Sequence, residues 1–182
     1  MNRTPIPWVQ NPDGSQGYTW NPITGCSPAS EGCAHCFAAA MAKRLRAMGA
    51  PGYENGFAVT FHEDRLDEPI KIKKASRIFV CSMGDLFHED VRKEERAMVF
   101  GSMIGAPQHT YMLLTKRAAA MAYWFEHWTA RGRWNLPNPW LGVTAENQEM
   151  WNERVPILMK IPAAVRFVSA EPLLGAIDLT RV

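Results

Sequence analysis

The second half of the sequence alternates short apolar runs with segments of helical character. After residue 77 the apolar runs have the length of strands, and helical stretches of about a dozen residues separate them. The predicted strands are RIFVCSM (77–83), HTYMLLT (109–115), PWLGVTA (139–145) and VRFVSA (165–170), and the predicted helices are 92–105, 118–128 and 147–161, the last disturbed by Pro156. Strands that are apolar throughout are typical of a parallel sheet covered by helices. The pattern therefore predicts an α/β domain, either an open doubly wound sheet or a complete or partial barrel.

The first half of the sequence is less regular. The segments expected here are an irregular N-terminal arm (1–18), a short edge strand interrupted by Pro22 (18–24), a helix closed by Gly49 (37–49) and a weaker strand (57–61). A chain of 182 residues suits one domain that buries most of its apolar surface without disulfides. We therefore predict a single domain over residues 1–182.

The predicted strands share a feature at their carboxyl ends. Each apolar run stops at a hydroxyl residue, and a charged, amide or thiol residue follows within three positions. These exits are Thr24-Gly25-Cys26, Ser82-Met83-Gly84-Asp85, Thr115-Lys116-Arg117, Thr144-Ala145-Glu146-Asn147 and Ser169-Ala170-Glu171-Pro172. The hydroxyls alone are equally typical of helix N-caps. Five polar exits at one edge favour the lining of a pocket, because chemistry gathers at the carboxyl ends of parallel strands.

The stretch TGCSPASEGCAHCF holds three of the chain's four cysteines, Cys26, Cys33 and Cys36, in the spacing C-x6-C-x2-C. The N-terminus has no apolar core of a secretory signal, and no apolar run is long enough to span a bilayer. We therefore expect a cytoplasmic protein without membrane contact. In a reducing compartment, clustered cysteines indicate metal binding or catalysis rather than disulfides.

Two kinds of metal centre match these thiols. An iron–sulfur cluster held by three cysteines keeps one iron open for a further ligand. A structural zinc ion needs a fourth protein ligand. The candidates for that ligand are His35, His62, His88 and Cys81. Cys81 lies within an apolar run, which is more typical of a buried small hydrophobe.

Motifs along almost the whole chain resemble a known family. TWNPITGCSPASEGCAHCF, CSMGDLFHEDV, LLTKR, WLGVTAEN and RFVSAEPLLGAIDL follow one another in the order seen in the phage-associated three-cysteine-motif family. Those proteins are encoded in phages, prophages and bacteria, which implies the cytoplasm of a bacterial host. The family is in turn similar to the radical S-adenosylmethionine superfamily, whose usual loop is C-x3-C-x2-C with an aromatic residue before the third cysteine. His35 occupies that position here, and the first gap is six residues instead of three.

This resemblance implies a fold and a chemistry. The fold would be an α/β partial (β/α) barrel with a curved, mostly parallel sheet and the cysteine loop at its C-terminal rim. Cys26, Cys33 and Cys36 would hold a 4Fe–4S cluster, and the open iron would bind S-adenosylmethionine. One electron would release a 5′-deoxyadenosyl radical, which takes hydrogen from an unidentified substrate. A partner protein that closes the partial barrel is also compatible with this fold.

The polar residues at the ends of the other predicted strands are the remaining site candidates. We assign cofactor binding to Ser82, Asp85, Thr115, Lys116, Glu146 and Glu171. Arg117 and His88 are the catalytic candidates, the first as an anion-binding group and the second as a proton donor. For His88 a helix-capping role matches the sequence equally well.

A second hypothesis is a non-catalytic zinc or iron–sulfur protein that acts in phage nucleic-acid metabolism or regulation. The helix after Cys36 carries Lys43, Arg44 and Arg46, the best candidates for a phosphate-facing surface. The formal net charge of +2 is too small to indicate nucleic-acid binding by itself. Metal content distinguishes the two hypotheses.

Overall fold

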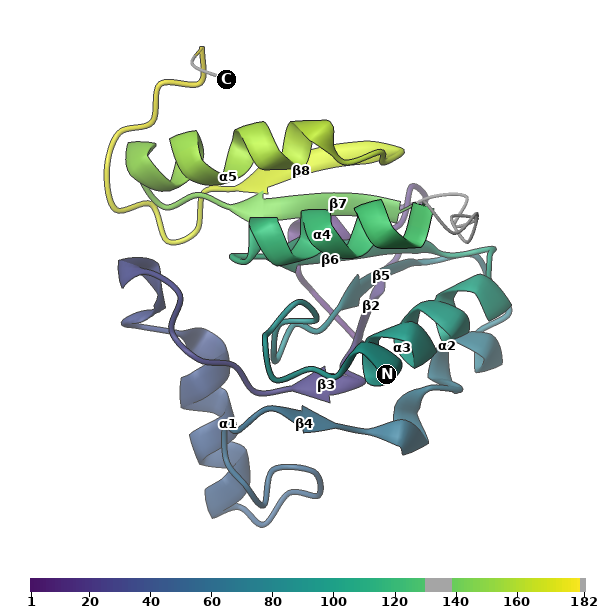
Figure 1. Ribbon diagram of the computed structural model, residues 1–182. Coiled ribbons are helices and arrows are strands. Elements are labelled where there is room, and N and C mark those ends of the chain that lie inside the picture. Colours follow the sequence, from purple (N-terminus) through teal and green to yellow (C-terminus); the bar gives the residue numbers. More distant parts are fainter. Residues whose placement is uncertain (130–138, 181–182) are drawn as a thin grey trace.

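The computed structural model of the protein describes residues 1–129 and 139–180, and its centre is a six-stranded sheet (Figure 1). The sheet order is β1-β2-β5-β6-β7-β8, and every pair from β2 to β8 is parallel, whereas β1 pairs with β2 in antiparallel fashion. Its strands are β1 (Asn2–Arg3), β2 (Tyr18–Trp20), β5 (Arg77–Val80), β6 (Thr110–Thr115), β7 (Pro139–Thr144) and β8 (Val165–Ser169). The predicted α/β class with a mostly parallel sheet is confirmed.

The remaining elements lie outside this sheet. The helices are α1 (Phe37–Ala47), α2 (Glu68–Lys71), α3 (Lys93–Gly105), α4 (Ala118–Thr129) and α5 (Gln148–Lys160), with short 3-10 helices η1 (Pro7–Val9), η2 (Glu31–Cys33) and η3 (Glu63–Arg65). Strands β3 (Ile23–Thr24) and β4 (Thr60–Phe61) form a separate antiparallel pair. Within the described residues, no helix combines the length and apolar character needed to cross a membrane.

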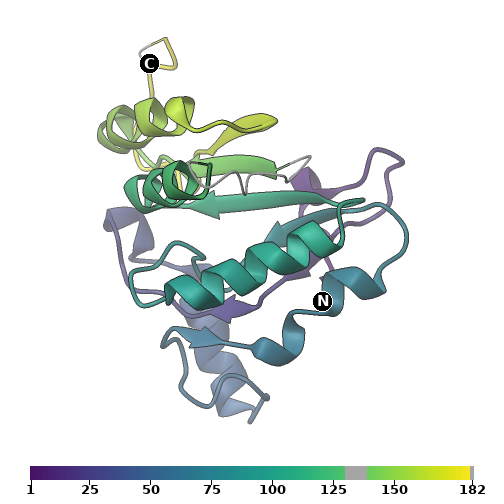
Figure 2. The same ribbon diagram turned by 45° about the vertical axis from the view of Figure 1, so that its right-hand side comes forward.

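One face of the sheet lies under helices, and we call it the covered face. Figures 1 and 2 show α3, α4 and α5 along the same side of the strands. The register pairs Ile78 with Tyr111 and Leu113 with Leu141, so these side chains point to the same side. They and Val143 are all at most 1% exposed and belong to one hydrophobic core.

The alternate residues of the same strands form the open face, defined here by Phe79, Met112, Leu114, Trp140 and Phe167. The register pairs Phe79 with Met112 and Met112 with Trp140. All of them except the buried Met112 are half-buried. The arm before β2 contributes Trp8, whose ring lies 4.6 Å from the Phe79 ring and 5.9 Å from the Phe167 ring. Aromatic side chains therefore dominate this face.

Two predicted strands differ from the observed ones because of local side chains. The strand predicted over 77–83 ends at Val80, and Cys81 has a φ of 58°, which starts a turn. Asn21 holds this turn, since its Oδ1 accepts a hydrogen bond from the Met83 N–H at 2.9 Å. The segment 18–24 divides at Asn21 and Pro22 into β2 and β3.

Two further predictions also need adjustment. The weaker strand predicted over 57–61 is only Thr60–Phe61, and it pairs with β3 outside the main sheet. Helix α5 continues through Pro156 to Lys160, where a disturbance was predicted. Trp151, Val155 and Leu158 are buried on both sides of the proline, and their packing outweighs the one missing helical hydrogen bond.

Candidate functional site

The cysteine loop leaves β3 through a tight contact with two other segments. Gly25 has a φ of 85° and donates its N–H to the Met83 carbonyl at 2.8 Å. A Cβ at Gly25 would lie 2.1 Å from the Ala58 carbonyl oxygen, so only glycine allows this approach. Cys26 follows and donates its own N–H to the Phe57 carbonyl at 3.2 Å. These backbone contacts thus fix the position of Cys26.

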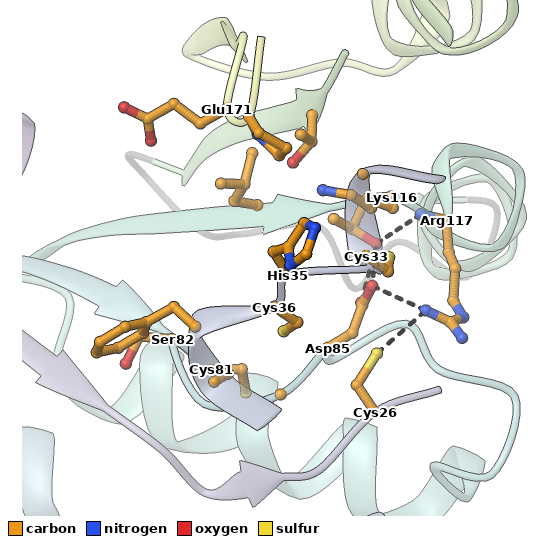
Figure 3. Close-up of a pocket in the computed structure, with 18 of the residues that line it drawn as sticks. Cys26, Cys33, His35, Cys36, Cys81, Ser82, Asp85, Lys116, Arg117 and Glu171 are labelled. Atoms are coloured by element: carbon orange, nitrogen blue, oxygen red, sulfur yellow. Dashed lines mark hydrogen bonds and ion pairs between the residues drawn. The ribbon is translucent and has the colours of Figure 1, made fainter. Parts of the chain in front are cut away.

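The thiols of Cys26, Cys33 and Cys36 line one cavity of about 450 Å³, the cysteine cavity (Figure 3). All three residues are partly buried. Most of the predicted site residues line the same cavity, namely Ser82, Asp85, Thr115, Lys116, Arg117 and Glu171. These residues follow or end strands β5, β6 and β8, so segments that are far apart in the sequence meet here.

Arg117 holds the first end of the loop. Its Nη1 donates to the Cys26 Sγ at 3.3 Å, and its Nη2 donates to the Ser27 Oγ at 2.9 Å and the Ser27 carbonyl at 3.2 Å. Its Nε donates to Glu89 at 2.8 Å, and Nη1 also lies 3.4 Å from Asp85. The guanidinium therefore ties the loop to two carboxylates.

His88 contacts the same end of the loop. Its ring is buried, and Nε2 accepts the Ser27 N–H at 3.1 Å and lies 2.7 Å from the Ser27 Oγ. The two catalytic candidates of the sequence thus both meet Ser27. In this arrangement they position the loop that carries Cys26.

Asp85 and Thr115 are hydrogen-bonded to each other inside the site. The Thr115 hydroxyl donates to both Asp85 carboxylate oxygens, at 2.9 and 2.8 Å, and accepts the Arg117 N–H at 2.9 Å. Asp85 also accepts the Phe87 N–H at 2.9 Å. Both side chains are buried and have protein partners, so they shape the wall of the cysteine cavity.

Glu146 holds the second end of the loop. It is fully buried, accepts from Arg154 Nη1 at 3.0 Å and forms a short hydrogen bond with the Ser30 hydroxyl. A Cβ at Gly32 would lie 2.9 Å from this carboxylate, so the loop backbone packs directly on Glu146. Burial raises the pKa of Glu146, but the Ser30 hydrogen bond and the Arg154 charge outweigh it and leave the pKa lowered. Asn147 adds a hydrogen bond to Glu31 at 2.6 Å.

Ser82, Lys116 and Glu171, the remaining predicted residues, line the same cavity. The Ser82 hydroxyl contacts the Asn21 side chain at 3.2 Å. Lys116 lies near the Cys33 thiol and helps to lower its pKa. Glu171 is exposed, and Figure 3 shows its carboxylate pointing away from the three thiols.

Three of the thiols, those of Cys26, Cys33 and Cys81, have different electrostatic surroundings. Partial burial and the Asp85 charge raise the pKa of Cys26, and Arg117 offsets part of that rise. For Cys33 partial burial is outweighed by the N–H groups of Ala29 and Ser30 and by Lys116, which leaves the pKa lowered. Burial raises the pKa of Cys81 to about 12. Cys81 thus has the surroundings of a neutral buried thiol.

Thiol sulfur is the donor that iron–sulfur clusters and zinc prefer, and three such donors line one cavity here. In the structure of the described residues, no three Cys, His, Asp or Glu side chains are close enough together to hold a metal ion. The donor set therefore fits a thiolate-bound metal in chemistry and in shared location.

Sequence reasoning missed three residues that hold the loop, namely Ser27, Ser30 and Glu89. Ser27 and Ser30 lie between the first two cysteines, which is the one signal that could have indicated them. Glu89 follows His88, but its partner Arg117 lies 28 positions further along the chain. Spacing along the sequence does not reveal such a pair.

Comparison with known proteins gives one match. A family model described as "Protein of unknown function (DUF5131)" matches residues 3–182. Neither the curated proteins nor the solved structures contain a significant match to the chain.

Proposed function

The chain belongs to the family described as "Protein of unknown function (DUF5131)", and from its cysteine cavity we propose that it is an iron–sulfur protein of the radical S-adenosylmethionine type. Cys26, Cys33 and Cys36 would hold a 4Fe–4S cluster that binds S-adenosylmethionine. The sheet acts as a partial barrel, with the cysteine loop at the rim formed by the carboxyl ends of its strands. The observation that carries this proposal is that three thiols share one cavity with the polar residues that follow three parallel strands.

The chain's own residues have distinct roles in this proposal. Arg117 and Glu146 position the two ends of the loop through the contacts to Ser27 and Ser30. Lys116 borders the cavity and supplies a positive charge for a carboxylate. When bound, the cluster supplies the electron that cleaves S-adenosylmethionine, a step that belongs to the cofactors.

Two other side chains orient the cofactor. Glu171 accepts hydrogen bonds from ammonium or ribose groups, and the Ser82 hydroxyl is a further polar contact. Asp85 and Thr115 close the wall behind them, since their polar atoms are bonded to each other. Phe79 and Leu114 belong to the apolar part of the lining.

The test is anaerobic purification of the full chain followed by iron and sulfide analysis. We expect about four irons and four sulfides per chain. Replacing Cys26, Cys33 or Cys36 by Ala should remove the iron, whereas Cys81→Ala, the matched control, should retain it. Equal loss of iron in the Cys81 variant would contradict the three-ligand site.

A second measurement tests the cofactor. Adding S-adenosylmethionine to the reduced cluster should change its electron paramagnetic resonance spectrum, and slow release of 5′-deoxyadenosine should follow. An unchanged spectrum at full cluster occupancy would leave an iron–sulfur protein that does not bind S-adenosylmethionine.

One observation favours a non-catalytic alternative. Helix α1 begins directly after Cys36, and its Lys43, Arg44 and Arg46 are all exposed. A metal that orders the loop would then present this basic helix to a nucleic-acid phosphate backbone. One zinc ion per chain, together with salt-dependent binding to nucleic acid, would support this function over the first.

A further inference from the structure

A second cavity, of about 460 Å³, lies against the open face of the sheet, and we call it the aromatic pocket. Its lining includes Trp8, Met112, Trp140, Phe167 and Glu171. Three aromatic residues, a methionine and one acidic residue thus line the same pocket. None of the three cysteines lines this pocket.

The aromatic walls come from three separate elements and are held in place. The register places Met112 beside Trp140 and Gly142 beside Phe167. A Cβ at Gly142 would lie 2.4 Å from the Phe167 ring, so this ring rests directly on the glycine backbone. Trp8 packs on Phe167 from the N-terminal arm. Glycine at position 142 therefore lets the Phe167 ring lie across the sheet.

The charges around the pocket restrict what it can bind. The Arg77 guanidinium already lies 4.7 Å from the centre of the Trp140 ring, and it is fixed by a hydrogen bond to the Gln10 carbonyl at 2.8 Å. A second cation against the same ring would be repelled by Arg77. The carboxylate of Glu171, in contrast, accepts hydrogen bonds and repels anions and carbonyl oxygens. A neutral ring with N–H donors satisfies both conditions.

We propose that the aromatic pocket binds a planar heteroaromatic ring that bears an amino group, of the nucleobase type. The ring contacts the faces of Trp140 and Phe167, and its amino group donates to Glu171. Aromatic side chains favour such offset contacts with flat π-systems, and nucleobases commonly use them. Because Glu171 lines both cavities, the aromatic pocket lies next to the cysteine cavity. A role as substrate of the cysteine cavity rests on the proposed function, whereas binding of the ring does not.

The probe for this site is 2-aminopurine, whose fluorescence is quenched when it stacks on tryptophan. Purine, which has the same ring system without the amino group, is the matched competitor. We expect the full chain to bind 2-aminopurine more tightly than purine by about five-fold, the effect of roughly one hydrogen bond. Tetramethylammonium should not displace it. Stronger binding of tetramethylammonium than of 2-aminopurine would overturn the proposal.

Three variants locate the binding. Trp140→Leu should weaken 2-aminopurine binding by about five-fold or more. Glu171→Ala should abolish the preference over purine, and because Glu171 is exposed this change leaves the fold intact. Tyr123→Leu, at a ring that is 65% exposed on α4 and outside the pocket, is the control and should change nothing. Unchanged binding in both pocket variants would reject the site.

The outcome can be separated from that of the proposed function. Each titration is made with the iron-free chain and with the iron-loaded chain. Binding to the iron-free chain supports the aromatic pocket even if no cluster forms. Full iron content without 2-aminopurine binding rejects the pocket alone.

Discussion

The two faces of the central sheet are formed by the same strands but lie in different environments. On the covered face, side chains such as Tyr111, Leu113 and Leu141 are almost completely buried beneath α3, α4 and α5. On the open face, Leu114 and Trp140 are half-buried and line cavities. Neighbouring residues in one strand therefore belong to different environments, because side chains alternate along a strand.

Adjacent residues of one strand therefore have different roles: one stabilises the core, and the next lines a cavity. A substitution on the covered face removes packing inside a closed core. A substitution on the open face alters the wall of a cavity that already exists. The predictions below test this separation, from the largest expected effect to the smallest.

The largest effect is expected for Leu141→Ala on the covered face. Leu141 is fully buried, and its truncation would leave a new cavity in the core. We expect the free energy of unfolding to fall by about 3 kcal/mol, measured by urea denaturation. Leu114→Ala, on the open face of the neighbouring strand, should cost only about 1 kcal/mol, because it enlarges an existing cavity. Equal costs for the two variants would show that the faces do not differ.

The next effect is expected at Gly142, where the open face depends on a missing side chain. In Gly142→Ala the new Cβ would meet the Phe167 ring at 2.4 Å, so the ring must move. We expect a loss of about 1–3 kcal/mol in the free energy of unfolding and loss of 2-aminopurine binding. The matched control is Gly101→Ala in α3, where nothing lies within 4 Å of the added Cβ. That variant should be neutral or more stable by about 0.5–1 kcal/mol, and unchanged 2-aminopurine binding in Gly142→Ala would count against the role of Phe167.

The central strands were predictable from the sequence, whereas the assignment of their residues to the covered and open faces was not. The apolar runs correctly predicted β6 and β7, because strands buried on one side by helices and half-buried on the other remain apolar throughout. That same uniformity hides which alternate residues face the helices. Trp140 and Phe167 were therefore not recognisable as a pocket. The φ of 58° at Cys81, which ends β5 early, likewise depends on the distant Asn21 side chain.

The site shows a similar division. Several of the polar residues at the strand ends line one cavity with the cysteines, because parallel strands bring their carboxyl ends together, whereas Glu146 and Asn147 do not line it. Their individual contacts were not predictable. Ser30 and Glu146 are 116 residues apart, and only the fold brings them into contact. Whether the thiols hold a cluster remains a prediction that metal analysis decides.

A smaller effect is expected at the end of the strands, where the covered and open faces meet the cysteine loop. Arg117→Gln removes the contacts to Glu89 and Ser27 that hold the first end of this loop. We expect a loss of about 1 kcal/mol in the free energy of unfolding, because the partner carboxylate of Glu89 is exposed and solvent screens the pair. Amide hydrogen exchange at Ser27 should become faster, since the loop loses its support. Exchange at Cys33, beside the end held by Glu146, should not change, and equal acceleration at both ends would argue against two independent anchors.

The smallest effect concerns the pH dependence of the Glu89–Arg117 pair. The hydrogen bond from Arg117 lowers the pKa of Glu89 from 4.5 to about 2. A carboxylate whose pKa is lowered by folding stabilises the folded state above its unfolded pKa, and this contribution is lost as the pH falls from 4.5 toward 2. Because Glu89 is mostly exposed, we expect no more than about 1 kcal/mol at neutral pH. Glu89→Gln should therefore lower the free energy of unfolding at about pH 6 and converge with the unmodified chain near pH 2. In the Arg117→Gln background the pH-dependent effect of the Glu89 substitution should be much smaller, and an undiminished effect there would assign the lowered pKa to another partner.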